Sequence, residues 1–218
     1  MSSRPKAADP RPVPRLYLMT PSIAEASTFG HRLAEALGAT AIAAVLLRFE
    51  NVDERTLINC AKAIVSVTQP RDVALLLDGR ADLVKRAGAD GAHLHGIDDF
   101  SAGLASLKPD RIIGAGGLTT RHDAMVVAEA GADYVMFGEP DRNGKRPSFA
   151  AIEERIAWWA EVFEPPCVGF AGSFDEIAPL AAAGADFVAL GDWLWAHTDV
   201  PDVLAHAAKQ LSLPETIG

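Results

Sequence analysis

Two histidines and a nearby aspartate form a compact group of side chains with metal-binding chemistry. His93 and His95 lie two residues apart in an apolar run, so both point to the same face if the run is a strand. Imidazole and carboxylate are common ligands of transition metals, and Asp98 follows three residues later. Packed or hydrogen-bonded histidines are the commoner outcome for such a pair, and we favour that interpretation over a metal site.

A second chemically active segment is the loop 139–148, which contains the cations Arg142, Lys145 and Arg146 beside an Asn-Gly pair. One interpretation is a solvated surface loop, which is ordinary for this composition. The other is a mobile lid whose cations hold a substrate phosphate. We favour the surface loop and keep the lid as the alternative.

The charge and composition limit the partners that these residues serve. The chain has 218 residues, 49% of them hydrophobic, and a formal net charge of −9. A net-negative chain repels phosphate backbones, so we expect no nucleic-acid partner. No apolar run approaches the ~20 residues of a membrane span, and residues 1–14 lack the apolar stretch of a secretory signal. We therefore expect no membrane partner and a cytoplasmic protein, with Cys60 and Cys167 as buried reduced thiols.

The elements that must position these residues are eight short apolar runs separated by segments with helical spacing. Runs of five to seven mostly apolar residues are typical of parallel strands buried on both faces. We predict strands at 15–20, 41–47, 73–78, 91–95, 111–115, 133–138, 167–171 and 186–191. Eight such units predict an α/β fold, a single-domain TIM (β/α)8 barrel over residues 15–212. Residues 1–14 are predicted to be a flexible arm and residues 213–218 a C-terminal tail.

A repeated turn supports the barrel. Ala-Gly-Ala-Asp occurs at 87–90, 130–133 and 183–186, and the related Leu-Gly-Ala-Thr occurs at 37–40. In each copy Gly can end a helix, and the following polar residue can form a local hydrogen bond as the next strand begins. A doubly wound open sheet also uses such turns, but no Gly-x-Gly-x-x-Gly motif opens the first unit. We therefore favour the barrel and expect its site where the strands end.

At these positions the chain resembles the thiamine phosphate synthase family, which includes TenI-type thiazole tautomerases. The resemblance is carried by RLYLMT at 15–20, LLDGRADL at 76–83, GADGAHLHGIDD at 88–99, IIGAGGLT at 112–119 and GADYVMFG at 131–138. It implies a TIM barrel that joins hydroxymethylpyrimidine diphosphate to thiazole phosphate and releases pyrophosphate. It also implies a Mg²⁺ cofactor and basic side chains directed at the diphosphate.

Carried over residue by residue, the resemblance implies that Arg48 and Lys145 hold the diphosphate and act in catalysis. It implies that Asp98 binds Mg²⁺. Asp78 stands where the family has Asn, and we assign it as a second Mg²⁺ ligand in place of the family's Asp at position 79. The residues that we assign to substrate binding follow the predicted strands: Asp78, Arg80, Gly116, Gly172, Ser173 and Gly191. For Arg80, however, we favour a structural ion pair with Asp82 over contact with a ligand.

Four residues at or near the ends of the predicted strands depart from the family's pattern. Leu46 replaces a Gln, Glu50 a Lys, Gly79 a magnesium-binding Asp, and Gly116 a Ser that contacts the pyrimidine. Each change removes a polar contact, a positive charge or a metal ligand around a diphosphate with about three negative charges. We predict that together they reduce or abolish efficient synthase chemistry.

The phosphate-binding region after the last two predicted strands is also altered. Gly172 and Ser173 open a helix, and their free N–H groups predict an anion site. Asp192 follows Gly191 where the family has a small Val/Ile-Ser pair. This aspartate either caps the next helix or repels a phosphate, and we favour the cap.

Two kinds of function follow from these observations. The first is a thiamine phosphate synthase-like transferase with reduced or lost activity. The second is a non-catalytic or regulatory paralogue that binds a phosphorylated metabolite at the barrel mouth, and an enzyme acting on another phosphorylated metabolite is a weaker third. A tautomerase is disfavoured because His122 lies too far into the next helix. Trp158 and Trp159 cannot both face the barrel, so one of them predicts a subunit contact in a homo-oligomer.

Overall fold

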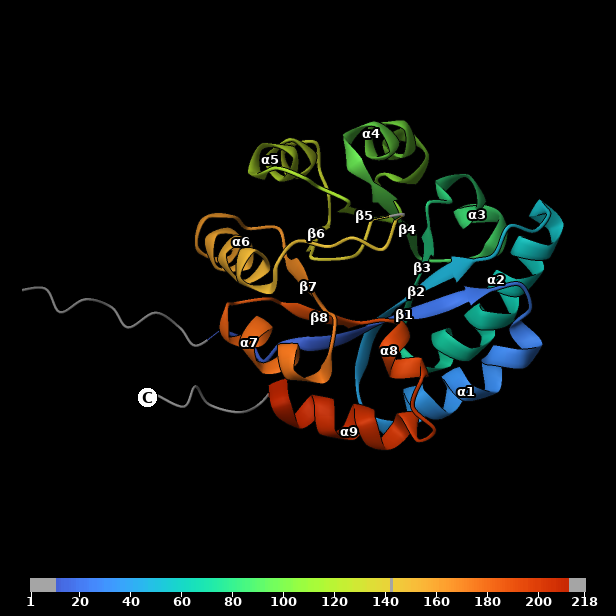
Figure 1. The fold of residues 1–218 in the computed structure, drawn as a ribbon. Helices are drawn as coiled ribbons and strands as arrows, with labels where there is room; N and C mark the ends of the chain where they lie inside the picture. Colours follow the sequence, from blue (N-terminus) through green and yellow to red (C-terminus); the bar gives the residue numbers. More distant parts are fainter. Residues whose placement is uncertain (1–10, 142, 212–218) are drawn as a thin grey trace, which may run out of the picture.

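The strands and helices alternate along the chain in the order predicted from the apolar runs. The computed structural model describes residues 11–141 and 143–211. Its strands are β1 (Arg15–Ile23), β2 (Ile42–Phe49), β3 (Ala74–Asp78), β4 (Gly91–His95), β5 (Ile112–Gly116), β6 (Tyr134–Phe137), β7 (Cys167–Ala171) and β8 (Phe187–Leu190). Its helices are α1 (Ala26–Ala39), α2 (Glu54–Thr68), α3 (Val84–Ala87), α4 (Gly96–Leu107), α5 (Arg121–Glu129), α6 (Phe149–Val162), α7 (Ile177–Ala182), α8 (Asp192–Trp195) and α9 (Val200–Leu211), with 3₁₀ turns η1 (Gln69–Arg71), η2 (Ala81–Leu83) and η3 (Phe174–Glu176). The parallel strands pair in sequence order and β8 pairs with β1, so the predicted TIM barrel is confirmed (Figure 1).

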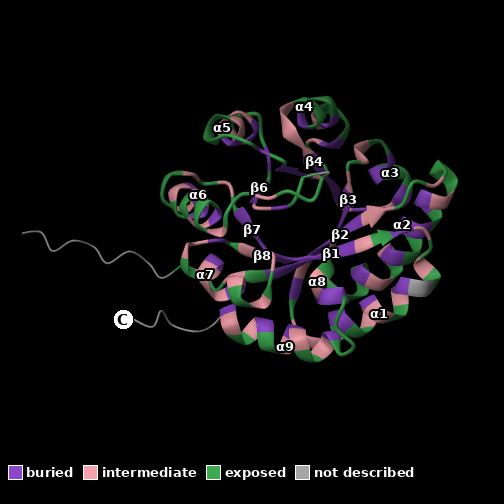
Figure 2. Ribbon diagram, in the orientation of Figure 1, coloured by how far each residue is buried: buried purple, intermediate pink, exposed green. Residues whose placement is uncertain are grey.

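Two apolar layers hold the barrel together. Tyr17, Leu46 and Leu76 belong to the cluster of inward-pointing side chains that fills the barrel. Their neighbours along the strands, such as Leu47 and Leu77, belong to the larger cluster between the strands and the helices. Successive side chains of a strand face opposite sides, so both faces are buried and each strand reads as a continuous apolar run. Figure 2 shows these buried strands inside a ring of helices with exposed outer sides.

The three Ala-Gly-Ala-Asp turns make the same contact three times. In each turn the aspartate carboxylate accepts a hydrogen bond from a backbone N–H near the start of the preceding strand. The donors are Leu75 for Asp90 at 2.7 Å, Ile113 for Asp133 at 2.8 Å and Cys167 for Asp186 at 2.8 Å. The repeated turns therefore lie together at the amino-terminal end of the barrel, as predicted from the repeat.

These carboxylates are expected to contribute measurably to stability. Asp90→Ala leaves the Leu75 N–H without its carboxylate partner, and we expect a loss of about 1–2 kcal/mol in the free energy of unfolding. Urea unfolding followed by circular dichroism measures the change. Asp110→Ala, at an exposed position, is the control and is expected to unfold like the parent protein. Equal stability of the two variants would contradict this role.

The first strand and the last helix give the two ends of the barrel within the described residues. β1 begins at Arg15 and α9 ends at Leu211. Of the predicted arm, residues 11–14 are described, and the Arg11 guanidinium donates a hydrogen bond to the carbonyl of Ala160 at 3.1 Å. Residues 1–10 and the predicted tail, 213–218, lie outside the described residues. Within the described part of the chain, no helix has the length and apolar character needed to span a membrane.

The cysteines and adjacent tryptophans occupy the environments that the sequence predicts. Cys60 and Cys167 are buried free thiols, and burial raises their pKa values to about 11 and about 12. Trp159 is fully buried. Trp158 is only partly buried, with the Arg121 guanidinium 4.7 Å from its ring centroid. A subunit contact through Trp158 stays a prediction.

Candidate functional site

A large cavity opens at the carboxyl ends of the strands. Its volume is about 940 Å³, which lies within the range of about 300–1,000 Å³ typical of small-molecule sites. Its walls come from segments that follow strands far apart in the sequence. The residues that line it include Arg48, Asp78, His95, Glu139, Lys145 and Gly191.

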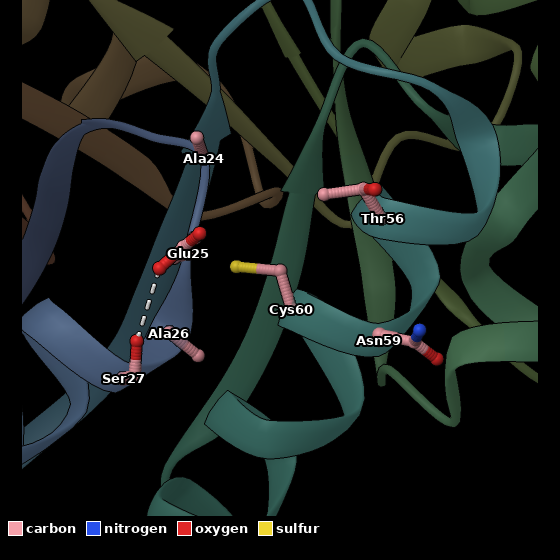
Figure 3. A pocket seen from close by; sticks show the side chains of 7 residues that line it. All are labelled: Ala24, Glu25, Ala26, Ser27, Thr56, Asn59 and Cys60. Atoms are coloured by element: carbon pink, nitrogen blue, oxygen red, sulfur yellow. Dashed lines mark hydrogen bonds between the residues drawn. The ribbon is translucent and has the colours of Figure 1, made fainter.

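A smaller hollow of about 240 Å³ lies between the first turns of α1 and α2 (Figure 3). The Ser27 hydroxyl donates a hydrogen bond to Glu25 at 3.3 Å on one side, and the Cys60 thiol lies on the other. None of the seven residues drawn around it is basic. The hollow therefore lacks the charge that a phosphorylated ligand needs, and the large cavity is the candidate site.

A buried chain of hydrogen bonds adjoins this cavity. His93 on β4 is fully buried, with Nδ1 at 2.9 Å from the Tyr134 hydroxyl and Nε2 at 3.1 Å from Glu139 Oε2. The Tyr134 hydroxyl lies 3.0 Å from that of Tyr17. Glu139 Oε1 accepts a hydrogen bond from the backbone N–H of Gly117. Each side chain in this chain of hydrogen bonds therefore has a partner, as buried polar groups require.

Two carboxylates of the site have pKa values below their ordinary values. Burial by itself raises the pKa of Glu139, but the charges of His93 and His95 and the hydrogen bonds outweigh it and hold that pKa below its ordinary value. Burial has the same opposing effect on Asp78. A 2.7 Å hydrogen bond to His95 Nε2, with further attraction from Arg48, keeps the pKa of Asp78 below its ordinary value. The cavity wall between β3 and β6 thus presents negative charge beside two imidazoles.

This arrangement predicts a loss of stability in acid. The pKa of Glu139 is lower in the folded state, so its stabilising effect is complete above the unfolded-state pKa of about 4.3 and disappears as the pH falls through the folded-state value. We expect Glu139→Gln to show a weaker dependence of unfolding free energy on pH between about pH 5 and about pH 3. Urea titrations across this range measure it. The control is Glu161→Gln, an exposed position on α6, and equal slopes in all three proteins would contradict the prediction.

Arg48 is held at the cavity wall by contacts on two sides. Its Nε donates a hydrogen bond to the Thr20 carbonyl at 2.5 Å, and its backbone N–H donates to Thr20 Oγ1 at 3.0 Å. Its guanidinium also forms an ion pair with Asp192. The helix cap predicted for Asp192 is wrong, because Gly191 is the N-cap of α8 and the Asp192 carboxylate reaches Arg48 instead.

The described part of the loop after β6 places two cations, Lys145 and Arg146, at the cavity. Asp141 Oδ1 accepts hydrogen bonds from the backbone N–H groups of Asn143 at 2.8 Å and Lys145 at 2.9 Å, which gives the loop a defined turn. Lys145 lines the cavity, as its predicted role requires. Arg142 lies outside the described residues.

The anion site predicted at Gly172 and Ser173 is occupied by a carboxylate of the protein itself. The Gly172 N–H donates a hydrogen bond to Glu176 Oε2 at 2.6 Å. Glu176 in turn pairs with the Arg146 guanidinium at 2.9 and 3.2 Å, and Ser173 is exposed. The prediction of a free N–H is wrong for Gly172, because a carboxylate four residues further along the chain folds back onto it. Arg146 is likewise bound to the barrel by this pair.

Local conformation explains two of the glycines that depart from the family's pattern. A Cβ at Gly116 would lie 1.9 Å from Glu139 Oε1 and 2.4 Å from His93 Nε2, so Glu139 occupies the space that a serine needs. Gly79 has φ +66°, a conformation that favours glycine over aspartate. Glycine at position 116 is therefore explained by the lack of space beside Glu139, and glycine at position 79 by the backbone conformation.

Several residues discussed from the sequence lie away from the cavity. Asp98 is exposed in the first turn of α4, and Glu50 is exposed just after β2. Arg80 does not line the cavity and pairs with Asp82 at 2.7 and 2.9 Å, which is the ion pair favoured from the sequence. Leu46 is buried among the inner apolar side chains. The repulsion predicted between Glu50 and a diphosphate is not supported by this placement.

The two carboxylates expected to hold Mg²⁺ are not both at the cavity. Asp78 lines it, whereas Asp98 does not. Mg²⁺ is commonly bound by one or two carboxylates together with substrate phosphates, so Asp78 fits an ion that arrives with a diphosphate. The structure also contains a separate group of potential metal ligands, His93, His95 and Glu139.

Glu139 and Tyr134 are the residues whose roles the sequence analysis missed. Glu139 is recognisable as the second residue after β6, but its distance along the chain from His93 hides their pairing. Tyr134 reads as an ordinary strand residue. The alternation of side chains along β6 reveals its orientation. Tyr134 and Met136 both belong to the inner cluster and therefore face the barrel axis.

A closed parallel barrel with cations and carboxylates around a cavity at its carboxyl ends defines a TIM-barrel protein with a small-molecule site. A family model described as "Thiamine monophosphate synthase" matches residues 16–193, and the chain belongs to this family. The thiamine-phosphate synthase of Rhodospirillum centenum is 38% identical, with 86% of this chain and 92% of the relative covered. That of Hyphomonas neptunium is 37% identical, with 94% and 96% covered.

Solved structures show the same fold. Thiamine phosphate pyrophosphorylase from Pyrococcus furiosus aligns with a TM-score of 0.75 at 22% identity, covering 90% of this chain and 95% of that structure. The 3-hexulose-6-phosphate synthase of Salmonella typhimurium aligns with a TM-score of 0.68 at 14% identity, covering 90% and 98%. These two likenesses confirm the barrel architecture.

Proposed function

We propose that this protein is a thiamine phosphate synthase, which joins hydroxymethylpyrimidine diphosphate to thiazole phosphate and releases pyrophosphate. The observation that carries the proposal is the convergence of Arg48 and Lys145, from β2 and from the loop after β6, on one large cavity. In a chain of net charge −9, cations gathered at a cavity favour an anionic ligand there. Family membership and the names of the relatives point to the same reaction.

The chain's own residues act mainly on the leaving group. As the bond between the pyrimidine methylene carbon and the diphosphate breaks, positive charge develops on the pyrimidine and negative charge on pyrophosphate. Arg48, already oriented by Thr20, and Lys145 stabilise that negative charge without reorganising. When bound, Mg²⁺ supplies further charge neutralisation, and Asp78 would hold it. We also propose that the reaction takes place in the cytoplasm, which the buried free thiols support.

A specific observation favours a second candidate function. Two groups that could receive phosphate already have protein partners: Arg48 pairs with Asp192, and the Gly172 N–H bonds to Glu176. If these contacts persist when the ligand binds, the second candidate function is the binding of a phosphorylated metabolite without turnover. In that case the pyrimidine diphosphate binds but no thiamine phosphate forms.

A direct assay separates the two candidates. Purified protein is incubated with hydroxymethylpyrimidine diphosphate and thiazole phosphate, with and without Mg²⁺, and thiamine phosphate is quantified after separation. Synthase activity predicts Mg²⁺-dependent turnover near ordinary enzyme rates of ~1–10 s⁻¹. Absence of product at high enzyme concentration would reject the synthase, and calorimetric binding of the pyrimidine diphosphate would then establish the second candidate.

A further inference from the structure

We propose that His93, His95 and Glu139 form a binding site for a divalent transition metal of the Zn²⁺ or Co²⁺ class. This site is distinct from the carboxylate-and-phosphate site that suits Mg²⁺, and it does not depend on the proposed synthase activity. One ligand atom from each of the three residues can be chosen so that all lie within 4.8 Å of one another. The group joins the end of β4 to the segment after β6.

The spacing of the ligand atoms suits tetrahedral coordination. Zn–N and Zn–O bonds of about 2.0–2.1 Å place tetrahedral ligands roughly 3.3 Å apart. His93 Nε2 lies 3.1 Å from Glu139 Oε2, and His95 Nδ1 lies 3.8 Å from Glu139 Oε1. Each imidazole nitrogen therefore lies close to one of the two Glu139 oxygens, and a set with one ligand atom from each residue spans at most 4.8 Å, which a small adjustment of the side chains brings to the tetrahedral value. An ion pair between His93 and Glu139 alone would not require a second imidazole directed at the same carboxylate.

The outer contacts of the three residues are those that orient metal ligands. Metal-binding histidines usually donate their other ring N–H to a carboxylate or another acceptor. His95 Nε2 lies 2.7 Å from Asp78 Oδ1, which makes a carboxylate–histidine pair, and His93 Nδ1 lies 2.9 Å from the Tyr134 hydroxyl. Glu139 also accepts the Gly117 N–H. The ring atoms that we propose as ligands are His93 Nε2 and His95 Nδ1, which are the atoms that lie toward Glu139.

Burial and charge favour a metal that keeps an exchangeable ligand. The side chains of His93 and Glu139 are 0% and 5% exposed, so one side of the group is closed by protein. His95 and Glu139 also line the large cavity, which leaves the remaining coordination position facing it. Two neutral imidazoles and one carboxylate leave a divalent ion with a net charge of about +1. The ligand class expected at that position is an anionic oxygen, from water or from a phosphorylated molecule.

Metal binding is tested on the full-length protein after treatment with a chelator. Co²⁺ is titrated in the absence of any substrate, and binding is followed by visible absorption, whose intensity reports tetrahedral coordination, and by calorimetry. The expected result is one bound equivalent that Zn²⁺ displaces and millimolar Mg²⁺ does not, because imidazole suits Zn²⁺ and Mg²⁺ prefers oxygen ligands. Absence of saturable binding, or displacement by Mg²⁺, would overturn the proposal.

Variants locate the bound metal. His95 is 36% exposed, so His95→Ala is expected to fold, and it should lower Co²⁺ affinity by at least about 100-fold and change the absorption band. Asp78→Asn, which alters an outer contact, should lower affinity by roughly 10–100-fold and keep the band. His206→Ala, an exposed histidine on α9, is the matched control and should bind like the parent. Unchanged affinity in His95→Ala would reject this site, whatever the outcome of the synthase assay.

Discussion

Gly116→Ser is expected to lower the free energy of unfolding by about 3 kcal/mol, because the new side chain must displace a buried ion pair. The added Cβ would lie 1.9 Å from Glu139 Oε1 and 2.4 Å from His93 Nε2. Glu139 then has to leave its bonds to His93 and to the Gly117 N–H. Urea unfolding of the variant and the parent measures the loss.

Two further variants show whether Glu139 is the cause. Removing that side chain eliminates the nearer of the two close contacts and frees the His93 ring to move, so Gly116→Ser should destabilise a Glu139→Ala background by much less than it destabilises the parent. Gly30→Ser on α1 is the matched control, since a Cβ at Gly30 meets no atom within 4 Å. If Gly116→Ser unfolds like the parent, or lowers the free energy of unfolding equally in both backgrounds, then Glu139 is not the reason that position 116 is a glycine.

Arg48→Gln is expected to lower kcat/KM for thiamine phosphate formation by about 10²–10³-fold. Its guanidinium is a preoriented donor, and loss of one such donor to developing negative charge typically has this effect. Arg48 is held by Thr20 and Asp192 before any substrate binds, so no reorganisation is needed at the moment of bond breaking. The measurement is steady-state formation of thiamine phosphate with both substrates varied.

The control for Arg48 is Arg71→Gln, because Arg71 is exposed and its guanidinium donates to the Val67 carbonyl away from the cavity. That variant should retain the parent's kcat/KM. Arg48→Lys retains the charge but loses the planar donor, so it should fall between the parent and Arg48→Gln. Full activity in Arg48→Gln would remove Arg48 from the catalytic site.

The barrel and the approximate positions of its strands follow from the sequence because their signals are local. A parallel strand buried on both faces must be continuously apolar, and the runs that end at Asp78 and begin at Gly91 coincide with β3 and β4 to within a residue. The repeated aspartates Asp90, Asp133 and Asp186 mark the turns that return the chain to the amino-terminal end. The sequence also predicts that Arg48, Asp78 and Lys145 lie at the carboxyl end of the barrel, because each is at the end of a parallel strand or in the loop after it, and all three line the cavity there.

What the sequence by itself could not determine is which side chains pair across the mouth. Glu139 reaches His93, Asp192 reaches Arg48 and Glu176 covers the Gly172 N–H. Two of these contacts join different βα units, and all three depend on side-chain reach within a few ångströms. Each segment taken by itself therefore indicates a helix cap for Asp192, an open anion site at Gly172 and no role for Glu139. The tertiary structure decides these roles because each charged group, once it is partly removed from water, is stabilised by the nearest partner of opposite charge or by a backbone donor.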